Sequence, residues 1–158
     1  MTCWQKTFIL FLRVALGILF LYAGWSHVST AAWSAATYLE GAKTFGWFYH
    51  ALLNPGVLPV VNFINEWGLT LLGASLILGV GVRISAPLGA ILMLLYYLPI
   101  LQFPIVGARS WLVDEHIVYA AALLVLFSFR AGRVYGIGTL CVSWPLCKRY
   151  SKLHSWLD

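Results

Sequence analysis

The chain has 158 residues, of which 61% are hydrophobic and only 9% are charged, and its mean hydropathy is +0.86. Soluble domains contain roughly 45–50% apolar and about 25% charged residues. The composition therefore excludes an ordinary soluble protein and indicates an integral membrane protein. The formal net charge of +5 comes from lysines and arginines scattered between apolar blocks. They form no basic face, so nucleic acid is not an expected partner.

Four apolar stretches are each long enough to cross a bilayer, which takes about 20 residues in a helix. They are Thr7–Val28, Val60–Val82, Ile84–Phe103 and Leu112–Phe129. The segments "NPGVLP", "GVGVRISAP" and "LQFPIVGARS" separate them with the proline and glycine typical of turns. We therefore expect an all-α membrane protein, built as a four-transmembrane-helix bundle.

The first apolar stretch has a second interpretation as a signal peptide, because Lys6 and Arg13 precede its apolar run. No clean small-x-small cleavage site follows that run directly, which favours a retained helix. We expect one four-helix membrane domain over residues 1–138 and an amphipathic, basic C-terminal tail over residues 139–158, attracted to anionic lipid.

The basic residues predict the orientation of the bundle. With four crossings, all ten lysines and arginines except Lys43 and Arg109 fall on the side of both termini. Cytoplasmic loops are enriched in lysine and arginine, so we expect both termini in the cytoplasm and the protein in the plasma membrane. Arg13 lies inside the first stretch, and we expect its long side chain to extend toward the cytoplasmic headgroups.

The segment between the first two stretches, "STAAWSAATYLEGAKTFGWFYHALLNPG", is too long for a tight turn and too polar for a further crossing. Aromatic and aliphatic residues recur in it at helical spacing. This pattern predicts one or two amphipathic interfacial helices, lying on the outer leaflet and covering that end of the bundle.

Under this topology, every helix brings polar side chains to the outer leaflet. These residues are His27, Asn62, Asn65, Glu66, Tyr96, Tyr97, Gln102, Asp114, Glu115 and His116. On a helix, Asn62 and Glu66 share a face, as do Glu115 and Tyr119, because four residues separate each pair. An ionisable group within a membrane span is a functional candidate by default.

We assign Glu66, Glu115 and His116 as candidate catalytic residues, because their side chains can transfer protons. The candidate ligand-binding residues are Asn62, Tyr96, Tyr97, Asp114 and Tyr119. Structural interpretations stay open beside these roles. A carboxylate in the first turn of a helix, such as Asp114, complements the helix dipole, and tyrosines are common in the interfacial aromatic belt of membrane proteins.

Several segments, taken in order, resemble the DoxX family of small four-helix membrane proteins. They are "RVALGILFLYAG", "NEWGLTLLGASLILGVGVR", "LVDEHIVYAAALLVL" and "AGRVYG". The resemblance extends from about Arg13 to Gly136, and the sequence departs from the family at Gly138, where an acidic residue is usual. The resemblance implies a membrane subunit similar to that of thiosulfate:quinone oxidoreductase. There, a DoxX-like subunit works with a DoxA-like subunit to transfer electrons from thiosulfate to membrane quinone.

The resemblance also implies a membrane quinone as the bound redox molecule, and a separate redox subunit or a second copy of the chain as partner. The sequence has no motif for a flavin, an attached haem or an iron–sulfur cluster, and Cys3, Cys141 and Cys147 lack the spacing of a zinc site. A haem held by His27 and His116 alone is one alternative. Another is a non-catalytic protein, either an assembly subunit or a carrier of a small lipophilic molecule.

Overall fold

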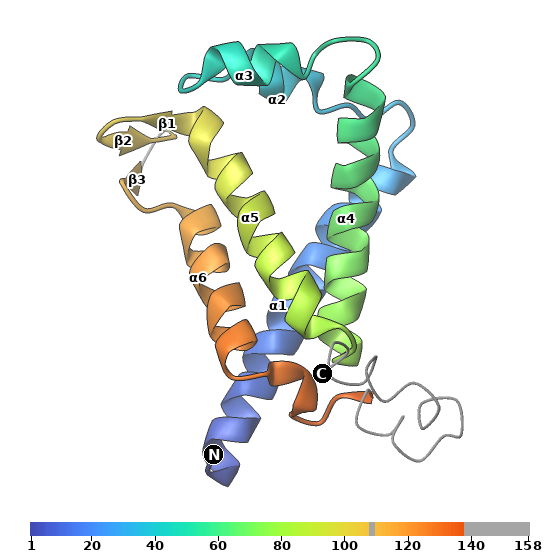
Figure 1. Cartoon of the computed structure of the whole chain (residues 1–158), viewed down its shortest axis with the longest axis vertical. Coiled ribbons are helices and arrows are strands. Elements are labelled where there is room, and N and C mark those ends of the chain that lie inside the picture. The colour runs from blue at the N-terminus through green and yellow to red at the C-terminus, as the bar shows by residue number, and fades with distance from the viewer. Residues whose placement is uncertain (108–109, 138–158) are drawn as a thin grey trace.

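The computed structural model describes residues 1–107 and 110–137, and it is mostly helical (Figure 1). Its helices are α1 (Cys3–Ser29), α2 (Ala36–Glu40), α3 (Gly46–Ala51), α4 (Leu58–Leu78), α5 (Val82–Ile100), α6 (Glu115–Ser128) and the short 3-10 helix η1 (Ala131–Arg133). Its strands are β1 (Leu101–Gln102), β2 (Ile105–Val106) and β3 (Ser110–Trp111). The expected tail over residues 139–158 lies outside the described residues.

Three helices, α1, α4 and α5, are long and apolar enough to cross a membrane. They correspond to the first three predicted stretches, and they indicate a multi-pass membrane protein. The fourth stretch was predicted as Leu112–Phe129, but α6 has only 14 residues. It begins later because Asp114 caps its N-terminus. At 1.5 Å per residue, α6 is about 21 Å long, shorter than the roughly 30 Å hydrocarbon core.

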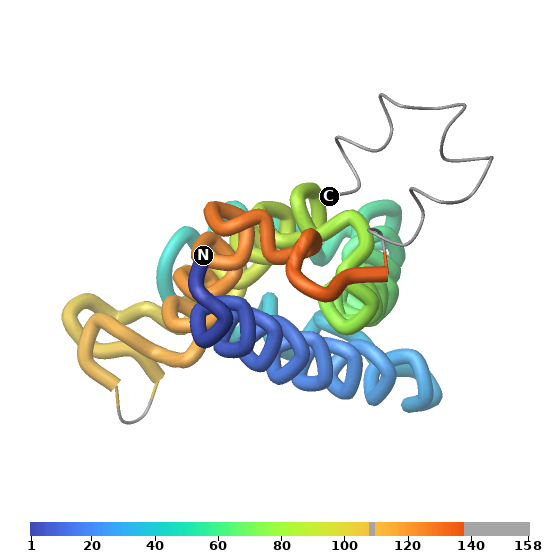
Figure 2. The backbone as a smooth tube through the Cα atoms, turned by 90° about the horizontal axis from the view of Figure 1, so that it is seen from below, coloured from blue at the N-terminus to red at the C-terminus, as the bar shows by residue number. Residues whose placement is uncertain are grey.

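The helices form two closely packed pairs, α1 with α4 and α5 with α6. The start of α1, the α4–α5 connection and the end of α6 lie at one end of the molecule, and α2 and α3 lie across the other (Figure 1). Viewed from the first end, α1 runs obliquely across the other helices (Figure 2). The core between them is apolar, with Phe20, Leu76 and Leu123 almost fully buried.

Glycines allow α1 and α4 to approach backbone to backbone. A Cβ added to Gly73 would lie 2.3 Å from the backbone nitrogen of Leu21, and one added to Gly24 would lie 2.3 Å from that of Thr70. No side chain fits at such distances. Small residues are the usual means by which helices pack tightly in lipid, where apolar surface alone does not drive association.

Arg13 does not extend to the headgroups as the sequence suggested. Its side chain is buried, with 1% of the residue exposed. Its Nη1 donates to the backbone carbonyls of Ala131, at 2.5 Å, and Val134, at 3.0 Å. The expectation was wrong because backbone carbonyls of the turn that follows α6 reach the guanidinium inside the protein.

The connection between α5 and α6 contains a small antiparallel sheet in the order β1-β2-β3, which the sequence did not predict. Gln102 pairs with Ile105, and Ile105 pairs with Trp111. Helix α5 therefore ends at Ile100, three residues before the predicted Phe103. The segment between α1 and α4 contains α2 and α3, as expected, while their position at a membrane interface stays a prediction.

We expect Gly73→Ala to destabilise the bundle, because the added methyl must displace the backbone of α1. Overpacking of this kind costs about 1–3 kcal/mol. Gly68→Ala is the matched control on the same helix, since its Cβ would meet only Cγ2 of Ile64, at 3.9 Å. Thermal unfolding in detergent should show a lower midpoint for Gly73→Ala alone. Equal midpoints for the two variants would contradict the backbone contact.

Candidate functional site

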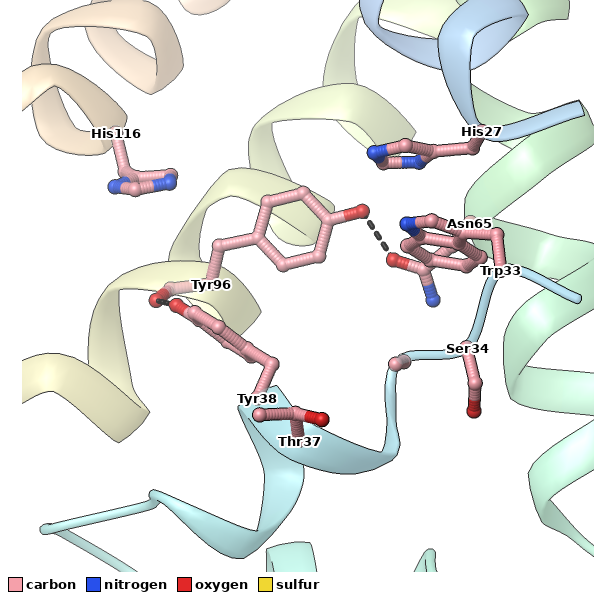
Figure 3. Close-up of a pocket in the computed structure, with 9 residues that line it drawn as sticks. His27, Trp33, Ser34, Thr37, Tyr38, Asn65, Tyr96 and His116 are labelled. Atoms are coloured by element: carbon pink, nitrogen blue, oxygen red, sulfur yellow. Dashed lines mark hydrogen bonds between the residues drawn. The ribbon is translucent and has the colours of Figure 1, made fainter. Parts of the chain in front are cut away.

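A cavity of about 510 Å³ lies beneath α2, at the end of the bundle covered by the short helices. Polar side chains enter it from α1, α4, α5 and α6, and the cap segment, residues 30–57, supplies the rest (Figure 3). The lining residues are His27, Trp33, Ser34, Ala35, Thr37, Tyr38, Asn65, Tyr96 and His116. The volume is within the range of about 300–1,000 Å³ typical of small-molecule sites.

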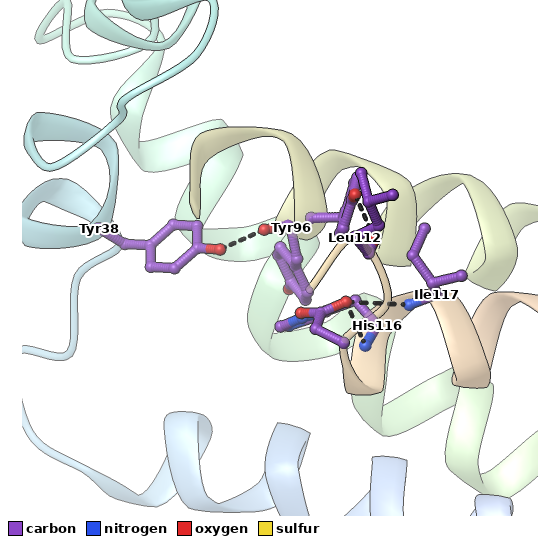
Figure 4. Close-up of polar contacts among 7 residues, drawn as sticks. Tyr38, Tyr96, Leu112, His116 and Ile117 are labelled. Carbon is purple, nitrogen blue, oxygen red and sulfur yellow. Dashed lines mark hydrogen bonds and ion pairs between the residues drawn. The ribbon is translucent and has the colours of Figure 1, made fainter. Parts of the chain in front are cut away.

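A proline in α5 provides a binding point for the cap segment. Pro99 has no N–H, so the carbonyl of Leu95, four residues earlier, lacks its usual partner in the helix. The hydroxyl of Tyr49, on α3, donates to this carbonyl at 3.0 Å. Tyr38, on α2, similarly donates to the carbonyl of Tyr96 (Figure 4). The cap segment is thus fixed to the last turns of α5 through backbone acceptors.

Asn62 fixes the other side of the cap segment to α4. Its Oδ1 accepts from the N–H of Ala35 at 3.0 Å, and its Nδ2 donates to Oγ of Ser34 at 3.4 Å. Both hydrogen bonds of the amide go to the cap segment, and Asn62 does not line the cavity. Its contacts position the roof of the cavity.

Asn65 and Tyr96 connect α4 and α5 at the cavity wall. The hydroxyl of Tyr96 donates to Oδ1 of Asn65 (Figure 3). Nδ2 of Asn65 donates to the carbonyl of Val61 at 2.7 Å, which fixes the amide orientation. Asn65 is buried, with 7% exposed. The cavity therefore contains a preorganised phenol, held at a definite position.

At the start of α6, a carboxylate holds a histidine at the cavity wall. Oδ2 of Asp114 lies 2.5 Å from Nδ1 of His116. Its other oxygen accepts from the backbone N–H groups of His116, at 3.1 Å, and Ile117, at 3.2 Å, which caps the helix (Figure 4). The ring of Tyr96 meets that of His116 edge to face, with centroids 5.8 Å apart. A carboxylate hydrogen-bonded to Nδ1 fixes the orientation of the ring and leaves Nε2 for a ligand.

His27 forms the opposite wall and has an unsatisfied nitrogen. Its ring stacks on Trp33, with centroids 4.0 Å apart and planes inclined by 15°. Its Nδ1 is buried and accepts or donates no hydrogen bond within the described part of the chain. The carboxylate of Glu66 lies near enough to interact with it electrostatically. Unpaired buried polar atoms are uncommon, and a bound ligand or water is one way to satisfy them.

The structure brings Tyr96 and His116 together at the cavity, with Asp114 directly behind. The other predicted residues lie elsewhere. Glu115 is exposed, the hydroxyl of Tyr97 donates to the carbonyl of Leu112 at 2.6 Å, and Tyr119 packs edge to face on Phe20.

Glu66 and Asn62, which the sequence places on one face of a helix, do not hydrogen-bond to each other. The amide of Asn62 is engaged by the cap segment, and the carboxylate of Glu66 makes no hydrogen bond to any residue in 1–107 or 110–137. In Figure 3 the phenol of Tyr96 lies between His27 and His116. Their imidazoles therefore do not face each other directly, which is unfavourable for the alternative of a haem held by this pair.

Sequence reasoning missed the contribution of the cap segment, namely Trp33, Ser34, Thr37 and Tyr38. It assigned His27 and Asn65 to the polar cluster, but it gave Asn65 no site role and His27 only the alternative role of a haem ligand. A signal was present in the cap segment, since tryptophan and tyrosine alternate there with small polar residues, a composition suited to the roof of a ligand site.

The phenol of Tyr38 should make the cap segment sensitive to alkaline pH. Burial, the neighbouring Tyr49 and the Asp114 carboxylate together raise the pKa of Tyr38 to about 12. An unfolded tyrosine has a pKa of about 10. Because the pKa of Tyr38 is higher in the folded than in the unfolded protein, its contribution to stability is complete below pH ~10. That contribution is lost as the pH rises through ~12.

Tyr38→Phe should therefore lower the thermal midpoint at neutral pH, and the difference from the wild type should shrink to nothing across that alkaline window. Tyr22→Phe, at a tyrosine that is 76% exposed on α1, is the control. A difference that stayed constant with pH would show that the Tyr38 hydroxyl does not hold the cap segment.

Residues 8–100 of the chain match the model of the DoxX family, which covers more than half of the sequence. The match includes His27, Asn65 and Tyr96 and ends before α6. Neither the curated proteins nor the solved structures that were compared with the chain gave a match.

Proposed function

The chain belongs to the DoxX family, and on this basis we propose that it is the membrane subunit of a quinone-linked oxidoreductase, similar to thiosulfate:quinone oxidoreductase. The cavity holds the quinone head group. The main support is the Asp114–His116 pair at the cavity wall, with a separation of 2.5 Å, beside the fixed phenol of Tyr96. A quinone site needs hydrogen-bond donors for two carbonyl oxygens and a route for protons. His116 can supply one donor and carry protons, and His27, whose buried Nδ1 has no partner among the described residues, can supply the second donor.

Reduction of a quinone to a quinol takes up two electrons and two protons. The electrons come from a separate donor subunit that oxidises a reduced sulfur compound, and the protons come from water. Protonated His116 donates from Nε2 to a quinone oxygen, and Asp114 stabilises its positive charge. His116 has 20% of its side chain exposed, so it can be reprotonated from the water side.

The two glutamates are the remaining candidate proton carriers. Glu115 is exposed and adjoins His116 in the chain, which suits a group that takes protons from water. Glu66 interacts electrostatically with His27 on the opposite wall, where a second proton is required. Both roles depend on the quinone proposal.

The function is tested by His116→Gln, which keeps much of the shape of histidine but cannot carry the proton. In the complex purified from native membrane, quinone should still co-purify, and quinone reduction should fall by about 100-fold or more, the usual contribution of a general acid. His50→Gln, at an exposed histidine on α3, is the control. Unchanged turnover in His116→Gln, or wild-type protein without quinone, would overturn the proposal.

A second candidate function is a non-catalytic carrier of a lipophilic molecule or an assembly subunit. It is favoured by the hydrogen bonds that Asn62, Asn65, Tyr96 and Tyr97 make within the protein. These are the contacts of a helix-packing network. If His116→Gln prevented assembly and the wild type showed no redox activity, this function would be preferred.

We also propose that α6 completes a fourth crossing, with both termini in the cytoplasm of the cell and α2 and α3 outside. The arrangement of Figure 1 supports this orientation. The start of α1, which contains Lys6, the start of α5, which contains Arg83, and the end of α6, which Arg130 follows closely, lie at the end opposite α2 and α3, while Lys43 lies between α2 and α3. Positive charge is enriched on the cytoplasmic side of membrane proteins.

Cysteine labelling tests this orientation. In a protein in which Cys141 and Cys147 are replaced by serine, native Cys3, which is exposed, should react with a membrane-impermeant maleimide only after the cells are permeabilised. A Gly41→Cys variant that also carries Cys3→Ser should react in intact cells. The reverse pattern would invert the topology.

A further inference from the structure

Two apolar spaces continue from the site cavity toward the lipid-facing surface between α4 and α5. The first is a smaller cavity of about 160 Å³. The second is a groove of about 520 Å³. The site cavity and the smaller cavity share four lining residues, Ala35, Tyr38, Asn65 and Tyr96. The smaller cavity and the groove share Ile64, Leu92 and Leu95. The site cavity therefore adjoins the smaller cavity, and the smaller cavity adjoins the groove.

The groove is apolar and opens to the outside of the bundle. Leu71 and Leu88, on its two walls, are 63% and 60% exposed. Its only hydroxyl side chains, Ser75 and Ser85, lie 2.7 Å apart and hydrogen-bond to each other, so they offer little to a polar ligand. From Ser75 to Ile64 the groove follows α4 for about 16 Å, at 1.5 Å per residue.

The position of the groove follows from the helix arrangement. Helices α4 and α5 meet at their short connection and diverge toward the end covered by α2 and α3 (Figure 1). The Ser75–Ser85 hydrogen bond joins them near the connection, and the Tyr96–Asn65 hydrogen bond joins them near the cap segment. Both residues of the second pair line the site cavity and the smaller cavity, so this bond lies at their junction.

We propose that the groove between α4 and α5 holds the apolar tail of the quinone whose head group occupies the site cavity, and that the quinone enters sideways from the bilayer at this point. The inference rests on the proposed function. A chamber that presents several polar side chains and continues into an apolar groove fits a molecule with a compact polar head and a long apolar tail. The roof is closed by hydrogen bonds from Tyr38, Tyr49 and Asn62, so a tail needs this lateral exit.

The tail gains little affinity from the groove, because lipid is as apolar as the groove itself. The role of the groove is steric: it lets the tail leave the protein while the head stays bound. Filling the groove should therefore weaken the binding of a quinone with a tail and leave the binding of a quinone without one unchanged. Comparing the two quinones therefore tests the path of the tail independently of the head-group site.

Gly68→Leu fills the groove with little risk to the fold, since a Cβ at Gly68 meets only Cγ2 of Ile64, at 3.9 Å. Ile91→Trp fills it from α5, at a residue that is 55% exposed. The control is Ala121→Leu, which adds a leucine side chain to an exposed position on α6 outside all three spaces. The full chain is reconstituted in lipid nanodiscs, and the probes are a benzoquinone with a decyl tail and the same ring with a methyl group instead.

We expect both groove variants to weaken binding of the decyl quinone by about tenfold or more, with the methyl quinone and the control unaffected. If both quinones bind the groove variants as they bind the wild type, the tail route is overturned and the proposed function stands. If the wild type binds neither quinone, both fail. A phospholipid that stays in the groove when the decyl quinone binds, as shown by lipid mass spectrometry, would also overturn the route.

Discussion

The buried guanidinium of Arg13 is the constraint from which the shape of the bundle follows. A charge taken out of water inside a membrane protein is costly unless it is compensated. Here the backbone carbonyls of Ala131 and Val134, in the turn that follows α6, accept hydrogen bonds from it. Gly79 leaves the space, because a Cβ there would lie 2.6 Å from Nη1 of Arg13. This contact connects α1 to the chain after α6, two elements that otherwise touch little.

Closure at the Arg13 end allows the helices to separate at the other end, where the site is formed. The space between them is filled by the cap segment, and its hydrogen bonds go to α4 through Asn62 and to α5 through Tyr38 and Tyr49. The cavity is therefore a product of the whole bundle. Its chemistry depends on a few groups that line the space between the separated helices, above all His116 and the phenol of Tyr96.

The sequence predicted the long helices well, because the length of an apolar run determines whether it can span a bilayer. It also predicted that polar groups of four helices would meet at one end, and the cavity contains His27, Asn65, Tyr96 and His116 from that set. It could not predict which way each side chain points. A helix that is apolar on all sides shows no preferred buried face, so the rotation that leaves Glu115 exposed is decided by packing. The sequence could not predict the partners of Arg13 either, since they lie 118 and 121 residues away along the chain.

The attachment of the cap segment to α5 makes the closure of the roof independent of the side chains that shape the ligand chamber. Tyr38, Tyr49 and Thr44 all donate to main-chain oxygens of the α5 region, and none of these hydrogen bonds goes to an α5 side chain. Substitutions on α5 that reshape the ligand chamber therefore leave these acceptors in place. Only a change at Pro99, which frees the carbonyl of Leu95, would alter the acceptor set. Members of a lineage with this architecture could diverge in the small molecule they accept while they keep the same closed roof.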